Sequence, residues 1–150
     1  MSRVQCGYCS LAFTIALLSL SACTDAPRAD PSNASQVASG KAVYDTHCAA
    51  CHGASLEGEP NWKSRKPTGR MPAPPHDDSG HTWHHADDIL FGITRVGLVP
   101  PYAPQNYQSD MPAFGASLTD QQIWELAYIK SRWSPRVREA QSQIQKQRNQ

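Results

Sequence analysis

The chain has 150 residues, of which 14 are basic and 13 are acidic, so its formal net charge is +1. A nearly neutral chain without a basic block has no charged surface suited to nucleic acid. Proline is frequent, with 12 residues, and large aliphatic side chains are sparse, so a single domain with a modest hydrophobic core is expected.

Residues 1–22 are typical of a secretory signal peptide. Arg3 gives a positive start, residues 11–20 are apolar, and small residues follow. The apolar stretch is shorter than the about 20 residues that span a bilayer. The Leu-Ser-Ala-Cys sequence that ends at Cys23 resembles a bacterial lipobox, in which the cysteine receives a diacylglyceryl group. This resemblance implies an exported protein, lipid-anchored to the bacterial cell envelope and facing the periplasm or extracytoplasmic side. The alternative is an ordinary signal peptide with a cysteine near its end.

The polar, proline-broken stretch that follows divides the remainder of the chain. Residues 23–34 are expected to form a lipidated tether. Residues 35–134 would then be the folded domain, and residues 135–150 a polar C-terminal extension. An N-terminal stretch without a role is equally compatible with the composition of residues 24–33.

A helix is predicted from Ser35 onward. Val37, Gly40, Tyr44 and Cys48 recur at three- and four-residue spacing, so they share one face. Glycine inside a helix is less favourable than alanine by about 1 kcal/mol. A glycine on the apolar face therefore indicates that another helix approaches closely at this point; the alternative is a glycine that is tolerated near the helix start.

Cys48-Ala-Ala-Cys51-His52 is the most specific motif in the chain. Two cysteines separated by two residues, with histidine directly after, form the attachment site of a c-type haem. The thiols can add to the two haem vinyl groups, and the adjacent imidazole can bind the iron. Half of a zinc site is the alternative, with further ligands from elsewhere. A dithiol redox pair is disfavoured because the chain lacks an alternating strand and helix pattern.

Gly40, Tyr44 and the motif up to His52 together resemble the opening of the class I cytochromes c, and the resemblance extends over residues 37–133. It implies an all-α fold in which the N- and C-terminal helices cross, and irregular proline-rich loops wrap one covalently bound haem c. In that family a proline carbonyl accepts a hydrogen bond from the ligand histidine. Pro60 is the first candidate for this proline, and Pro74 is the alternative.

Four histidines follow within ten residues, and they permit two interpretations. One is a second metal site for copper or zinc, since imidazole binds both metals. The other is a polar loop and the start of a helix. The residues concerned are His76, His81, His84 and His85.

A second helix is predicted over about Ala86–Val96. Asp87 and Asp88 lie in its first turn, where carboxylates interact favourably with the positive helix end. Gly97 is expected to end the helix. The acidic pair is therefore interpreted as stabilising the start of the helix and not as a metal or catalytic site.

Met111-Pro112 lies shortly before the last predicted helix. The family resemblance implies that Met111 is the second axial ligand of the iron, because class I cytochromes c carry a methionine in such a segment. Pro112 biases Met111 toward an extended backbone, which suits presentation into a pocket. There are three alternatives to Met111 at this position of the iron. They are Met71, which also precedes a proline; a histidine; and an open position.

The last helix is predicted to run from Thr119 to about Trp133. Thr119 is the N-cap and Gln122 can close a capping box. Apolar residues fall on two arcs of this helix, so it is expected to be buried on two sides. A further helix can start at Pro135, but residues 135–150 are expected to be a solvated extension.

These features together predict a one-electron carrier and not an enzyme. An iron with both axial positions filled by His52 and Met111 has no place for a substrate. The family implies redox partners, such as a quinol-oxidising complex and a terminal oxidase or reductase of a bacterial respiratory chain. Membrane contact would come through the lipid anchor. The alternatives are a haem protein with an open distal site, such as a peroxidase or gas sensor, and a copper- or zinc-handling protein that uses the histidine group.

Overall fold

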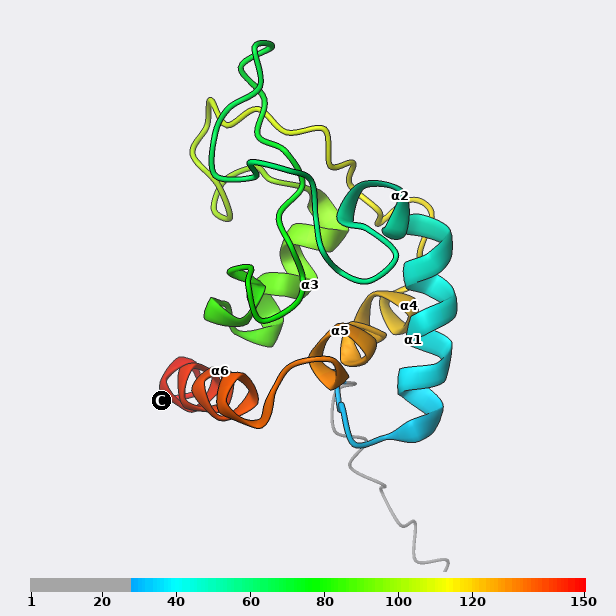
Figure 1. Cartoon of the computed structure of the whole chain (residues 1–150). Coiled ribbons are helices and arrows are strands. Elements are labelled where there is room, and N and C mark those ends of the chain that lie inside the picture. The colour runs from blue at the N-terminus through cyan, green and yellow to red at the C-terminus, as the bar shows by residue number, and fades with distance from the viewer. Residues whose placement is uncertain (1–27) are drawn as a thin grey trace, which may run out of the picture.

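The computed structural model describes residues 28–150. The predicted signal peptide, Cys23 and the beginning of the tether lie outside the described residues. The described chain is all-α and contains one isolated backbone bridge, between Met71 and Ser109, but no strand. Its helices are α1 (Ala34–His47), α2 (Ala49–His52), a 3-10 turn (Thr82–His84), α3 (Asp87–Val96), α4 (Asp120–Trp124), α5 (Ala127–Ser131) and α6 (Pro135–Arg148) (Figure 1). Among residues 28–150, none of these helices has the length and apolar character to cross a bilayer.

Helix α1 forms as predicted and crosses α5. The Asn33 side chain caps its start by accepting from the amides of Ser35 and Gln36. Gly40 is buried where the two helices meet, and a Cβ atom there would lie 2.3 Å from the Glu125 carbonyl oxygen and 2.9 Å from Tyr128 Cβ. The predicted close approach at Gly40 is therefore confirmed, since any side chain would push the helices apart.

The predicted C-terminal helix is interrupted after Trp124. Its start is confirmed, with Thr119 as N-cap and Gln122 closing the capping box. The amides of Glu125 and Leu126 then bond to carbonyls three residues back, each at 3.3 Å, so the backbone tightens between α4 and α5. This interruption lies at the crossing with α1. The predicted burial on two sides is confirmed because residues 127–130 are all buried.

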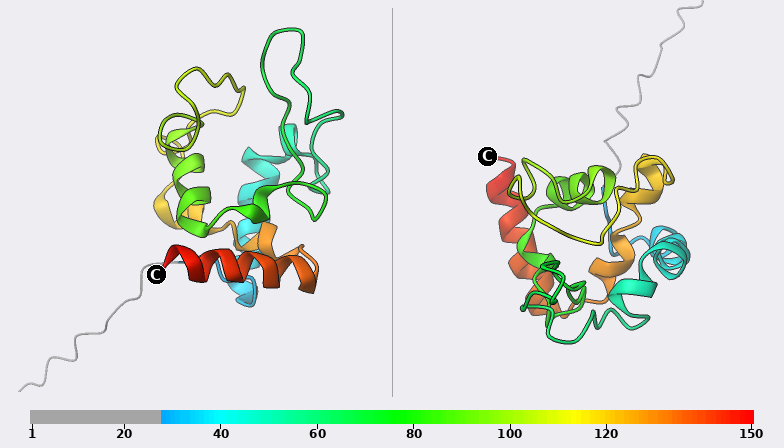
Figure 2. Two further views of the ribbon diagram at one scale, coloured as in Figure 1. Left: turned by 90° about the vertical axis from the view of Figure 1, so that its left-hand side faces the viewer. Right: turned by 90° about the horizontal axis from the view of Figure 1, so that it is seen from above.

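Residues 135–150, interpreted from sequence as a solvated extension, contain a helix whose inner face packs against the domain. Residues 135–148 form α6, with Ser134 as N-cap and Pro135 in the first turn. Val137 is completely buried and Gln141 is 4% exposed, because both lie on the face turned toward the domain. In the left view of Figure 2, α6 runs along the base of the molecule below α3. Its apolar stripe is narrow, so polar side chains provide much of the contact.

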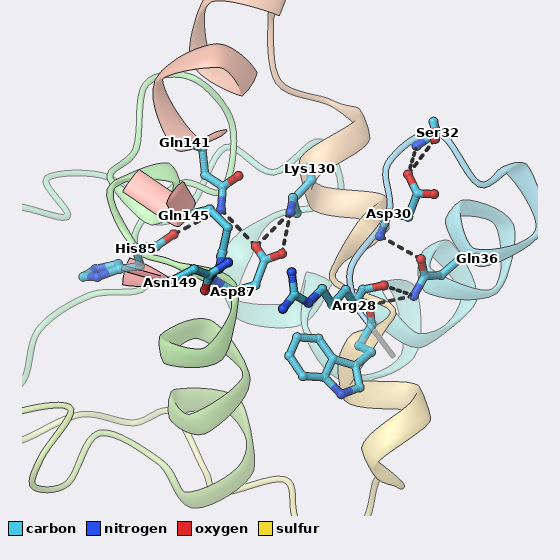
Figure 3. Close-up of polar contacts among 11 residues, drawn as sticks. Arg28, Asp30, Ser32, Gln36, His85, Asp87, Lys130, Gln141, Gln145 and Asn149 are labelled. Carbon is cyan, nitrogen blue, oxygen red and sulfur yellow. Dashed lines mark hydrogen bonds and ion pairs between the residues drawn. The ribbon is translucent and has the colours of Figure 1, made fainter. Parts of the chain in front are cut away.

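A buried polar network joins α3, α5 and α6 (Figure 3). The Lys130 ammonium lies 2.8 Å from both carboxylate oxygens of Asp87, and each side chain is only 9% exposed. Gln141 donates to Asp87 Oδ1 at 2.9 Å, and Gln145 accepts from the Asp87 amide at 2.9 Å. Asp87 does lie in the first turn of α3, as predicted, but it also holds α5 and α6 against that helix.

The hydrophobic core lies between α1, α5, the start of α6 and the loop that follows α2. Its buried members are Tyr44, Leu56, Tyr128, Ile129, Trp133 and Val137. Cys48 and Ala49 are partly buried against this cluster. The core therefore supports the junction between α1 and α2, where the Cys-x-x-Cys-His motif begins.

Candidate functional site

The Cys-x-x-Cys-His motif occupies the turn at which α1 ends and α2 begins. Cys48 is half-buried, Cys51 is exposed, and both are free thiols. The Cys51 amide donates to the Cys48 carbonyl at 3.1 Å, so the two cysteines belong to one helical turn and present their sulfurs on neighbouring positions. Burial, with a smaller contribution from Cys51, raises the pKa of the Cys48 thiol to about 11. Two neighbouring thiols directly before a histidine are the arrangement that haem attachment requires.

The His52 ring is buried and held through one nitrogen. Its Nδ1 lies 2.8 Å from the carbonyl oxygen of Pro74. A carbonyl can only accept, so Nδ1 carries the proton and Nε2 keeps its lone pair for a metal. Burial lowers the pKa of His52, although the hydrogen bond to Pro74 opposes this effect. The ring is therefore kept in the neutral form that metal binding needs.

The choice of Pro60 as partner of His52 is wrong, because Pro74 occupies that position. The reason is a backbone pairing that sequence spacing does not reveal. The Glu59 amide donates to the Ala73 carbonyl at 2.8 Å, and the Ala73 amide donates to the Glu59 carboxylate at 2.6 Å. These bonds place Pro74 at the ring, whereas Pro60 lies in an exposed turn on the other side of the pairing.

Gly58 makes this pairing possible, and sequence analysis did not identify it. Its φ angle is +68°, and a Cβ atom there would lie 2.4 Å from the Pro75 nitrogen. Only glycine fits so close to the Pro74-Pro75 backbone. The sequence signal that could have found it is a glycine shortly after the motif, followed by a second proline-rich segment.

The four histidines do not gather into one site. His76 stacks on His52, His81 stacks on Trp62, and His84 stacks on Trp83. His85 meets His81 edge to face at 5.6 Å between ring centroids. Among residues 28–150, no group of three or more histidine, cysteine, aspartate or glutamate side chains is arranged to hold a metal ion. The arrangement of the described residues therefore gives no support to a second metal site at these histidines or to a zinc site at the two cysteines.

Both candidate methionines lie where two proline-rich loops meet. Met71 forms the backbone bridge with Ser109, and the Met111 amide donates to Ser109 Oγ at 3.0 Å. Arg70 ties the loops together by donating to the Ser109 carbonyl at 2.6 Å and pairing with Asp110 at 3.0 Å. The two loops rise together at the top of Figure 1. The structure thus brings both methionines to one region.

The segment that follows Met111 also contacts the end of α1. Phe114 lies edge to face with His47, the residue before Cys48, at 6.2 Å between ring centroids. The Phe114 amide donates to the Thr94 carbonyl of α3 at 2.9 Å. The Met111 segment therefore runs between the C-terminal end of α3 and the cysteine motif.

This donor set fits a covalently bound haem. It combines two adjacent thiols, an imidazole whose free nitrogen is defined by its hydrogen bond, and half-buried thioethers at the facing loops. The Cytochrome c family model matches residues 37–133, a range from α1 through α5 that ends before α6. A comparison with curated proteins and one with solved structures each found no match. The chain belongs to the cytochrome c family, adopts its all-α fold, and is a c-type cytochrome with covalently bound haem c and a role in electron transfer.

Proposed function

We propose that this cytochrome is a one-electron carrier with His52 and Met111 as axial ligands, tethered to a bacterial membrane and working in a respiratory chain. The hydrogen bond from His52 Nδ1 to the Pro74 carbonyl carries the first part of the proposal. It gives His52 a fixed tautomer, and it raises the basicity of Nε2 toward iron.

Three residues of the motif would hold the cofactor. Cys48 and Cys51 would form the two thioether bonds, and His52 would bind iron from the same turn. When bound, haem c supplies a couple between ferric and ferrous iron. A methionine ligand raises the potential of that couple relative to two histidines. No residue is then required to hold or transform a substrate, which favours electron transfer over peroxidase or gas-sensor chemistry.

Met111 is a better candidate for the second ligand than Met71. Its segment is fastened to the cysteine motif by the contact between Phe114 and His47, and to α3 by the bond from Phe114 to Thr94. The backbone of Met71, in contrast, is tied to the facing loop through its bridge with Ser109. Pro112 follows Met111 directly and disfavours helical backbone there.

Two matched variants of the holoprotein test the ligand assignment. The ferric wild type is expected to show a sulfur-to-iron charge-transfer band, which Met111→Ala abolishes and Met71→Ala retains. Loss of the band in Met71→Ala alone would assign the ligand to Met71. A high-spin ferric wild type whose spectrum shifts on addition of cyanide or peroxide would support the open-site alternative and contradict the proposal.

The tether rests on the Leu-Ser-Ala-Cys sequence that ends at Cys23. Two acyl chains anchor a protein firmly, whereas one binds a membrane only marginally. A tether would also raise the effective concentration of membrane-bound partners, such as a quinol-oxidising complex and a terminal oxidase or reductase. The nearly neutral net charge gives little electrostatic steering, so confinement at the membrane would matter more.

Fractionation of cells tests the tether. The wild type is expected in the membrane fraction, and Cys23→Ser is expected to be released or left unprocessed. Cys6→Ser, within the same predicted signal peptide, is the matched control and should behave like the wild type. A wild-type protein found wholly in the soluble periplasmic fraction would refute the tether while leaving the ligand assignment intact.

A further inference from the structure

The face of the His52 ring is covered by a second imidazole. The His76 ring stacks on it at 3.8 Å between centroids, with 22° between the ring planes. The His52 ring can turn about its Cβ–Cγ bond, and the hydrogen bond from Nδ1 to Pro74 limits this freedom at one edge of the ring without abolishing it. A flat group against the face removes this freedom.

The position of His76 is set by its backbone and not by its side chain. The His76 amide donates to the Leu56 carbonyl at 2.8 Å, and the Trp133 indole donates to the His76 carbonyl at 2.8 Å. Leu56 and Trp133 both belong to the buried core. These bonds persist whatever side chain stands at residue 76, so the side chain can be exchanged while the backbone stays in place.

The His76 side chain is not explained by hydrogen bonding. Its Nδ1 is buried and has no partner. A buried polar nitrogen without a partner costs free energy that an apolar side chain of similar size would avoid. Tyr44 contacts the His76 ring only edge to face, at 6.1 Å between centroids. The stack on His52 is thus the closest ring contact that the imidazole makes.

We propose that His76 is a positioning residue that fixes the plane of the His52 ring, and thereby the orientation of the proximal ligand toward iron. This inference rests on the proposed axial role of His52. The orientation of an axial imidazole governs its overlap with the iron d orbitals, and groups around a ligand tune both its geometry and the potential of the metal. A polar, polarisable ring beside His52 also stabilises the more positively charged ferric state relative to an aliphatic neighbour.

Three variants of the full-length holoprotein test the proposal through the electron paramagnetic resonance g values of the ferric form and the reduction potential. His76→Leu removes the flat face and the polar nitrogens, so we expect altered g values and a raised potential. His76→Phe keeps a ring against His52, so we expect g values close to the wild type with a raised potential. His84→Leu makes the same exchange at an exposed histidine stacked on Trp83 and should leave both readouts unchanged.

Unchanged g values and potential in His76→Leu would overturn the proposal. So would equal changes of the g values in His76→Leu and His76→Phe, because the ring stack would then not set the ligand plane. If His76→Leu yields no holoprotein, His76→Phe decides: an unchanged potential overturns the proposal and a raised one with retained g values supports it. A wild-type ferric spectrum that is not low-spin would instead refute the axial assignment of His52 and Met111.

Discussion

Replacing Lys130 by methionine removes one partner of the buried ion pair that joins α3 and α5. Removing one partner of a buried pair costs about 3–5 kcal/mol, because the other charge is left unpaired. Asp87 would keep its bond from Gln141 at 2.9 Å and its position in the first turn of α3, where a carboxylate gains ~0.3–1 kcal/mol. We therefore expect the lower end of the range, a loss of ~3 kcal/mol in the free energy of unfolding. For a domain of this size that loss lowers Tm by roughly 10 °C.

Urea unfolding of the holoprotein, followed by circular dichroism, measures this change. Lys41→Met is the matched control, since Lys41 pairs with Asp45 on the exposed surface of α1, where solvent screens the pair, and its loss should cost far less than the loss of Lys130. Adding Asp87→Asn to Lys130→Met removes the unpaired charge and should recover at least ~1 kcal/mol. A stabilising role of the buried pair is refuted if Lys130→Met destabilises no more than Lys41→Met, or if the double variant is less stable than Lys130→Met.

Two further predictions concern the helix crossing and the pairing of segments near His52. Gly40→Ala should lower the free energy of unfolding by ~1–3 kcal/mol, measured by urea unfolding, because its Cβ would lie 2.3 Å from the Glu125 carbonyl oxygen. This loss is expected although alanine is the better helix former. A stabilised variant would contradict the close crossing of the helices. The Ala73 amide and, to a smaller extent, Lys66 hold the pKa of Glu59 below its usual 4.5, so its contribution to stability is complete above pH 4.5 and is lost as the pH falls through the lower folded-state pKa. Glu59→Gln should therefore lose less stability than the wild type as the pH falls below 4.5. If the stability of the variant and of the wild type fall in parallel over this pH range, Glu59 does not stabilise the fold through its charge.

Local patterns predicted those elements whose causes are local. The cap at Thr119, the end of α3 at Gly97 and the start of α6 at Pro135 all depend on residues within one turn. The close approach at Gly40 was predictable because glycine is unfavourable inside a helix, so its place on the apolar face favoured a packing role. The interruption between α4 and α5 was not predictable from local sequence, because it lies at the crossing with α1.

The pairing of distant segments decided the features that sequence analysis missed. Pro60 is nearer to His52 in the sequence, but the bonds between Glu59 and Ala73 bring Pro74 to the ring across 22 residues. Residues 135–150 are rich in glutamine and arginine, which suggested a solvated extension. Gln141 and Gln145 instead bond to Asp87, a partner that only the fold supplies.

The chemistry of the site follows from the sequence: a haem-attachment motif, a histidine beside it, and a methionine before the last helices. These depend on residue type and short spacing, which the chain carries whatever its fold. The tertiary structure alone decided which carbonyl holds the His52 ring, that His76 covers its face, and that the other histidines form no metal cluster. The physical reason is that hydrogen bonds and ring stacking act over a few ångströms. The residues that make these contacts are brought together by irregular loops, and the path of such loops cannot be predicted from periodicity in the sequence.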